Sequence, residues 1–132
     1  MKKLLTLLLL SPLAFAEMKP LKEYIASTDE LGASEVLYAN YRCIGLYGMV
    51  ANVTGGSSQD NSQNIRGIAE ENSKKLMEET YKIWASVRED KSFEAYSQNL
   101  KDTVRPIADN YQRLANENWL NNGAYFEGNE LI

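Results

Sequence analysis

The side chains of this sequence that could do chemistry are carboxylates, tyrosines, arginines and one cysteine, and no histidine accompanies them. Histidine is the commonest general base and metal ligand, so its absence excludes Ser-His-Asp and Cys-His catalysis, histidine-based zinc or di-iron sites and covalent c-type haem. A single cysteine also excludes zinc sites built from several thiolates. We therefore predict no metal site, no cofactor and no catalytic residue that the sequence can name.

Paired carboxylates are the remaining catalytic possibility, because two of them can hydrolyse a glycosidic bond when one lies in a pocket that raises its pKa. Several acids in the middle of the chain instead precede a lysine by four positions, which is the spacing of ion pairs on a solvated helix face. These pairs are Glu70 with Lys74, Glu71 with Lys75, and Glu78 with Lys82. Asp102 and Asp109 are single acids without a partner that the sequence identifies.

Most of the tyrosine, arginine and cysteine candidates would be positioned by one helix over residues 36–53. We call it the hub helix. At about 100° per residue, Ile44 is the centre of one largely apolar side. That side also holds Ala33, Leu37, Asn40, Tyr41, Tyr47, Gly48 and Ala51. The opposite side is apolar too, with Tyr38, Ala39, Leu46, Met49 and Val53. Two apolar sides require two neighbours, either inside a bundle or at an interface, and the polar Asn40, Arg42 and Asn52 argue against a membrane span.

Four residues on this second side are our predicted binding residues: Tyr38, Arg42, Leu46 and Met49. Arg42 follows Tyr38 by one turn and precedes Leu46 by one turn, so its stem can cover both and its guanidinium can stack on the tyrosine ring. Two hypotheses remain open for Arg42. It pairs with a carboxylate on another helix, or it belongs to a surface that binds a partner.

Cys43 is the sole cysteine, so no disulfide can form within the chain. It lies at the flank of the first apolar side of the hub helix. We predict a free, buried thiol that packs as a small hydrophobic group, and the alternative is a disulfide between two chains.

Residues 1–16 have the pattern of a secretory signal peptide. Lys2 and Lys3 precede an apolar run over residues 4–10, and Ala14 and Ala16 are the small residues at positions −3 and −1 of a cleavage site. The run is too short to span a bilayer. We predict cleavage after residue 16 and a mature protein in the periplasm or outside the cell, without a membrane anchor.

The remaining residues, 17–132, suit a single helical domain that can bury a core without disulfides. The formal net charge of the whole chain is −4, and removal of the two leader lysines makes the mature protein more acidic. An acidic chain without a basic run lacks the surface that dominates binding to phosphate backbones, so we predict no nucleic-acid partner.

A short helix is expected over residues 17–26, with Pro20 in its first turn. Residues 27–30, Ser-Thr-Asp-Glu, have the form of a capping box, and Ser34 is a competing cap. We therefore place the start of the hub helix between residues 28 and 35. A polar, glycine-containing loop begins at Thr54 and ends the hub helix.

Two amphipathic helices are predicted after this loop, over residues 64–88 and 92–118. Residues 89–91 allow only a tight reversal, which predicts that these helices are antiparallel neighbours. Pro106 cannot donate to the helix ladder, so we expect a kink or a break there.

The sequence Asn-Asn-Gly at residues 121–123 should end the last helix, with Gly123 in the left-handed conformation. The tail over residues 124–132 holds Tyr125, Phe126, Leu131 and Ile132. Because aromatic and aliphatic side chains at this density favour burial, we expect the tail to dock on the bundle.

The sequence thus predicts an all-α fold, a small antiparallel bundle of about three long helices with a short N-terminal helix and a docked tail. The function that follows is non-catalytic binding by an exported protein, as an inhibitor, adaptor or envelope accessory factor. Its partner would be another protein or a second copy, through the hub helix. The alternatives are a carboxylate-based hydrolase of a saccharide or envelope polymer and a self-assembling structural protein.

Overall fold

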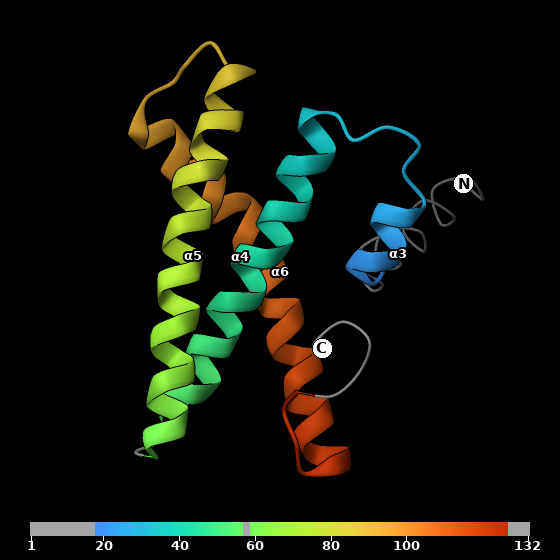
Figure 1. Ribbon diagram of the computed structural model, residues 1–132, viewed down its shortest axis with the longest axis vertical. Coiled ribbons are helices and arrows are strands. Elements are labelled where there is room, and N and C mark those ends of the chain that lie inside the picture. The colour runs from blue at the N-terminus through green and yellow to red at the C-terminus, as the bar shows by residue number, and fades with distance from the viewer. Residues whose placement is uncertain (1–17, 57–58, 127–132) are drawn as a thin grey trace, which may run out of the picture.

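The computed structural model describes residues 18–56 and 59–126, which form four helices and no strand (Figure 1). The helices are α3 (Leu21–Ala26), α4 (Ala33–Gly55), α5 (Asp60–Ser86) and α6 (Phe93–Asn122). The three long helices pack together, and the short α3 contacts α4. The predicted all-helical class is confirmed. The predicted leader, residues 1–16, lies outside the described residues.

Helix α4 contains the hub helix and packs against both of the other long helices. In Figure 1, α5 runs beside α4, and α6 crosses α4 near the middle of the molecule. Leu37, Tyr41 and Ile44 belong to one buried cluster, and Met49 belongs to a second. Helix α4 thus has two buried sides and two long helices as neighbours, as the sequence predicts.

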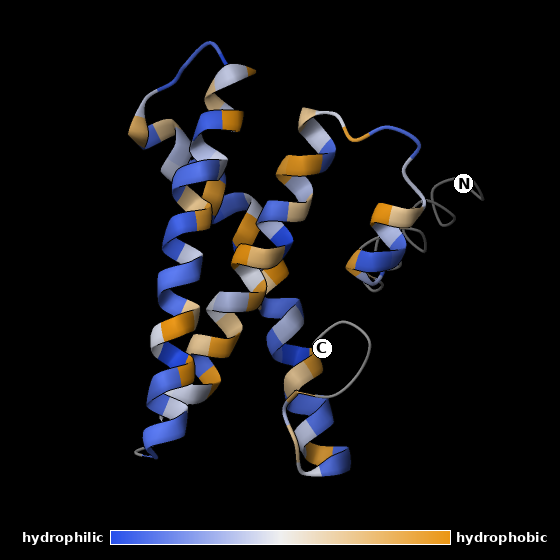
Figure 2. Cartoon of the chain, in the orientation of Figure 1, coloured by the Kyte–Doolittle hydropathy of each residue, from blue (hydrophilic) through white to orange (hydrophobic). Residues whose placement is uncertain are grey.

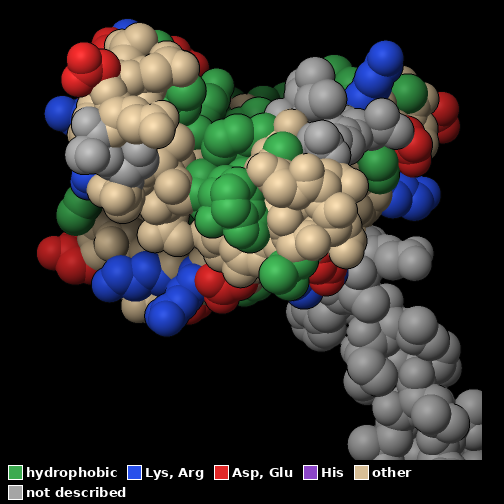
Figure 3. Space-filling model, turned by 90° about the horizontal axis from the view of Figure 1, so that it is seen from below, with side chains coloured by type: hydrophobic (Ala, Val, Ile, Leu, Met, Phe, Trp, Pro, Cys, Tyr) green, Lys and Arg blue, Asp and Glu red, His purple; other side chains and the backbone are tan. Residues whose placement is uncertain are grey.

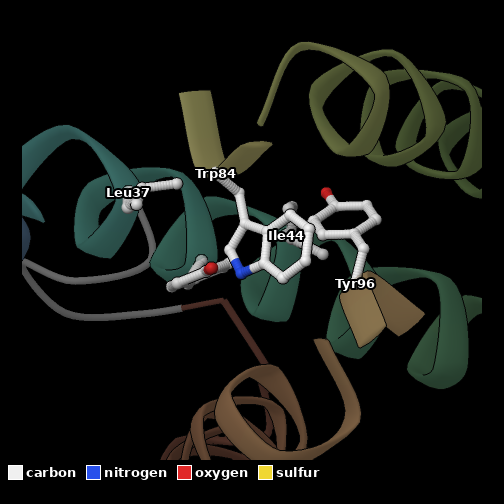
Figure 4. Packing of buried hydrophobic residues seen from close by; sticks show 5 residues of the cluster. Leu37, Ile44, Trp84 and Tyr96 are labelled. Atoms are coloured by element: carbon white, nitrogen blue, oxygen red, sulfur yellow. The ribbon is translucent and has the colours of Figure 1, made fainter. Parts of the chain in front are cut away.

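The first buried cluster is aromatic and draws on all three long helices. Figure 4 shows the indole of Trp84 reaching from α5 toward Ile44 of α4, with Leu37 on one side and Tyr96 of α6 on the other. The rings of Trp84 and Tyr96 have centroids 5.3 Å apart and planes tilted by 50°. Tilted aromatic pairs of this kind add to the free energy gained from burying their area.

Helices α4 and α6 approach each other closely at Gly45. A Cβ atom added at this glycine would lie 2.7 Å from Cγ2 of Ile107 and 3.2 Å from the backbone nitrogen of Ala108. Ile107 packs against both buried clusters, so the crossing joins the two parts of the core. The lack of a side chain at Gly45 therefore sets how closely the two helices approach.

Helices α5 and α6 were expected to be antiparallel neighbours, and this holds only near their connection. There the Tyr96 hydroxyl donates to the carbonyl oxygen of Met77 at 2.6 Å, and the rings of Tyr81 and Tyr96 meet edge to face at 5.1 Å. Away from this connection, the backbones of α5 and α6 are not in extended contact. The two helices run in opposite directions and are neighbours through these side chains near their connection, as predicted, and α6 then crosses α4.

The predicted caps of the hub helix are also wrong. Its N-cap is Gly32, whose backbone is extended and which provides no side-chain bond. Ser27 instead ends α3, and its hydroxyl donates to the carbonyl oxygen of Tyr24 at 2.9 Å. Ser34 lies inside the first turn of α4. The start at Ala33 falls within the predicted interval.

Helix α5 begins earlier than expected, at Asp60. The predicted start at residue 64 followed the first apolar position and ignored the polar residues before it. An acidic residue in a first turn is favourable because the helix N-terminus carries a partial positive charge.

Helix α6 is continuous through Pro106, so a break at this residue is wrong. Figure 1 shows α6 bending along its length, as expected for a proline that cannot donate to the carbonyl of Asp102. Gly123 ends the helix with φ of 72°, as predicted.

The start of the tail docks on α6. The ring of Tyr125 stacks on Trp119 with centroids 4.8 Å apart, and Tyr125 also packs against the second buried cluster. Docking is therefore confirmed for Tyr125, whereas Phe126 is exposed, and the prediction for residues 127–132 lies outside the described part of the chain.

Candidate functional site

Arg42, the most informative charge in the sequence, is fully buried, with 0% of its surface exposed. Its Nε donates to the hydroxyl oxygen of Tyr111 at 2.9 Å, and its Nη1 donates to the carbonyl oxygen of Lys19 at 2.8 Å. Nη1 also lies 3.3 Å from the hydroxyl of Tyr38. The guanidinium carbon is 5.7 Å from the Tyr38 ring centre and 5.5 Å from that of Tyr111.

These contacts give Arg42 an internal role. It joins α4 to α6 through Tyr111, and to the segment before α3 through Lys19. The described acceptors are phenol oxygens and a backbone carbonyl, and the expected carboxylate partner stays a prediction. Predicted stacking of Arg42 on Tyr38 is confirmed.

The other predicted binding residues separate into buried and accessible ones. Met49 is 2% exposed and lies in the second buried cluster with Tyr111. Leu46 is half-buried beside that cluster, and half-buried Tyr38 packs its ring 4.6 Å from that of Tyr24. Direct contact with a partner is thus open to Tyr38 and Leu46, and their role in binding stays a prediction.

Cys43 is half-buried rather than buried, and the choice between a free thiol and a disulfide between two chains stays a prediction. Burial raises the pKa of this thiol, and the positive charge of Arg42 acts in the opposite direction. The residue lies between the two buried sides of α4, which explains its partial exposure.

The acidic residues of α5 lie on its solvated face. Glu71 accepts from Lys75 at 2.6 Å as predicted, and this hydrogen bond with the lysine charge lowers the pKa of the carboxyl. Glu70 pairs with Arg66 at 2.8 Å instead of the predicted Lys74. Within the described residues, no group of three or more acidic or cysteine side chains is arranged to hold a metal ion.

An apolar groove of about 670 Å³ lies between α5 and α6, near their connection. It exists because the aromatic residues at that end hold the two helices apart. Its wall is almost entirely apolar and is formed by Lys74, Met77, Glu78, Tyr81, Phe93, Tyr96, Ser97 and Leu100. Phe93 lies at its edge with 75% of its surface exposed.

The polar atoms of the groove tyrosines are used within the fold. Tyr96 donates to Met77 O, and the Tyr81 hydroxyl donates to the carbonyl oxygen of Lys91 at 2.7 Å. Burial, with the neighbouring Tyr41 as a smaller cause, raises the pKa of Tyr96 to about 12. The two tyrosines therefore contribute mainly ring surface to the groove, because their hydroxyls donate to backbone carbonyls.

A smaller cavity of about 320 Å³ continues this groove along α6. It shares Met77 and Leu100 with the groove and is also lined by Ile44, Gly48, Ser73, Lys101, Val104, Arg105 and Ala108. Helix α4 forms its floor through Ile44 and Gly48. We call the two together the α5–α6 trough.

The sequence pattern did not reveal this trough. Phe93, Tyr96 and Leu100 fall on the apolar side of their helix, which indicates a core position in a closed bundle. Tyr96 is buried as expected, whereas Phe93 is exposed and Leu100 is half-buried, because α5 and α6 diverge and that divergence depends on packing between distant residues.

Other apolar surface is present elsewhere on the molecule. Figure 3 shows hydrophobic side chains gathered in the middle of the lower face, with charged side chains toward the edge. Leu120 near the end of α6 is 82% exposed, and Trp119 is half-exposed. A further cavity of about 240 Å³ lies between α4 and α5, lined by Leu46, Tyr47, Val50, Ile65, Ile68 and Ala69.

Comparison with protein-family models, curated proteins and solved structures found no match. Among the described residues, no helix is both long and apolar enough to cross a bilayer. The argument for function therefore rests on the chemistry of the trough and of its surroundings.

Proposed function

We propose that this protein acts by non-catalytic binding and that the α5–α6 trough is its contact surface for an apolar ligand. The observation that carries this proposal is the groove of about 670 Å³ with an apolar wall and a phenylalanine, Phe93, that is 75% exposed at its edge. Ligand sites commonly have volumes of roughly 300 to 1,000 Å³ and apolar, aromatic linings. Exposed apolar surface beside such a groove is typical of an interaction site.

The trough supports binding better than hydrolysis. A glycoside hydrolase needs two carboxyl groups roughly 5 to 9.5 Å apart. Glu78 is the one acidic side chain among the residues that line the trough. The hydroxyls of Tyr81 and Tyr96 already donate to backbone carbonyls, which leaves no acid and base facing each other.

The predicted leader gives this binding function its proposed location. A chain with a cleaved signal peptide over residues 1–16 would bind its ligand in the periplasm or outside the cell. An inhibitor, an adaptor or an envelope accessory factor would each use such a surface without performing a reaction.

The test uses N-phenyl-1-naphthylamine, a neutral apolar fluorophore, titrated into the purified protein. Phe93→Ala removes exposed aromatic surface from the edge of the groove, and because the ring is mostly outside the core the fold should persist. We expect the dissociation constant of the fluorophore to rise roughly tenfold, which is about 1.4 kcal/mol.

The matched control is Leu120→Ala, which removes an even more exposed side chain from the same helix, far from the trough along the chain. It should leave the dissociation constant unchanged. Equal binding by the wild type and Phe93→Ala, or loss of binding in Leu120→Ala alone, would contradict the proposed site.

A further inference from the structure

We propose that the occupant of the trough is an amphipathic helix of a partner protein that carries acidic residues beside its apolar face. This inference rests on the proposed function and specifies the ligand of the same site. The shape of the trough, the spacing of its residues and the sign of its charges support this ligand.

The α6 wall of the trough has the spacing of a helix-packing stripe. Phe93, Ser97, Leu100 and Val104 follow one another at intervals of four, three and four residues. This is the alternation found at the contact line of coiled coils. At 1.5 Å per residue, the stripe is about 16 Å long, or three helical turns.

The α5 wall repeats this arrangement. Ser73, Met77 and Tyr81 follow at intervals of four residues, so they share one side of that helix. Two helical walls above a floor of α4 form the space that a fourth helix occupies in a helical bundle. Peptide grooves that bind amphipathic helices have this construction.

The charges around the trough are mostly positive on a protein whose formal net charge is −4. Lys74, Lys101 and Arg105 line it with Glu78 as the acidic member. The ion pairs within the described residues involve other side chains, so these three cations are available to a partner. Complementary rim charges select and orient a partner, which favours acidic flanks on the bound helix.

The open side of the trough favours a helix over an acyl chain. Small apolar ligands are usually enclosed over most of their surface. Here Phe93, Lys74 and Glu78 are exposed at the groove, so it is not enclosed and the outer face of a bound helix would remain in water. An amphipathic helix has such a polar outer face, whereas a lipid chain does not.

The experiment compares two synthetic peptides with identical apolar residues at helical spacing, one flanked by glutamates and the other by lysines. Binding to the purified protein is followed by fluorescence anisotropy, and peptide helicity by circular dichroism. We expect the acidic peptide to bind at least roughly tenfold more tightly than the basic one, and to gain helicity on binding.

Two charge-reversal variants with the same change in net charge test whether the charge dependence of peptide binding comes from the trough. Lys101→Glu, in the trough, should weaken the acidic peptide roughly fivefold and strengthen the basic one. Lys82→Glu, on the solvated face of α5, should change neither dissociation constant by more than about twofold. Unchanged helicity of both variants in the absence of peptide shows that the fold persists.

Four results would overturn the inference. Equal binding of the two peptides would remove the charge argument, and binding of neither peptide by a protein that still binds N-phenyl-1-naphthylamine would leave the proposed function standing without a helical ligand. A dimer in sedimentation that Phe93→Ala dissociates would assign the trough to a second copy. Failure of both the peptides and the fluorophore to bind would reject the proposed function as well.

Discussion

At the scale of single residues, Arg42 shows which contacts a sequence can predict and which it cannot. Its position on the second apolar side of the hub helix and its stacking on Tyr38 follow from helical periodicity alone, and both are observed. Its acceptors, Tyr111 and the carbonyl of Lys19, are distant in sequence, so no local pattern identifies them. The internal position of Arg42 depends on the packing of α6, and both its pairing with a carboxylate and its part in a binding surface stay predictions.

Replacement of Arg42 by methionine should therefore affect stability strongly. The change keeps an apolar stem but removes the donor to the buried phenol of Tyr111 and to the part-buried carbonyl of Lys19. Each unsatisfied group costs roughly 1 to 3 kcal/mol, so we expect the free energy of unfolding to fall by about 3 kcal/mol in urea titrations.

Arg113→Met is the control for this measurement. Arg113 is an exposed residue of α6 whose ion pair with Glu117 lies in solvent. Its loss should change the free energy of unfolding by less than about 0.5 kcal/mol. A similarly small effect of Arg42→Met would show that the internal contacts of Arg42 contribute little to the fold.

At the scale of elements, the periodicity of α4 predicted its two buried sides but not its closest contact. The spacing of apolar side chains predicts which faces of a helix are buried. A glycine has no side chain, so this spacing does not show that it lies at a helix crossing. Periodicity places Gly48, and not Gly45, on the Ile44 side of the hub helix, yet Gly45 meets α6 and Gly48 has open space where a Cβ would be placed. The caps were predicted incorrectly for a related reason, since Ser27 is used by α3.

The two glycines provide a paired test of the α4–α6 crossing. In an exposed helix interior, alanine is more stabilising than glycine by about 0.5 to 1 kcal/mol, and Gly48→Ala should raise the free energy of unfolding by that amount. Gly45→Ala places a methyl group against Ile107 and the backbone of Ala108, so it should lower this free energy by about 1 to 3 kcal/mol. Thermal or urea unfolding measures both.

The close α4–α6 crossing requires that Gly45→Ala and Gly48→Ala change the free energy of unfolding in opposite directions. Stabilisation by both substitutions would show that α6 does not approach Gly45 closely. Destabilisation by both would mean that the surroundings of Gly48 are also tightly packed.

At the scale of the whole molecule, the helical class and the central place of α4 could be predicted because they depend on composition and periodicity. The trough could not, because it results from the width of the aromatic residues Tyr81, Trp84 and Tyr96 between α5 and α6 and from the bend of α6. A short connection predicted that these helices reverse direction, but the distance between them depends on side-chain size. The candidate binding surface thus lies where the direction of two neighbouring helices could be predicted and the distance between them could not.

The methionines allow the central claim, that the trough is the binding surface, to be tested within one sample. Met77 lines both parts of the trough, whereas Met49 is buried in the second cluster and Met18 packs beside that cluster. With ¹³C-labelled methionine methyl groups, each residue reports separately by nuclear magnetic resonance during titration with N-phenyl-1-naphthylamine. We predict that the Met77 methyl resonance shifts and saturates while those of Met49 and Met18 stay in place. A stationary Met77 resonance, with or without movement of the other two, would contradict the assignment of binding to the α5–α6 trough.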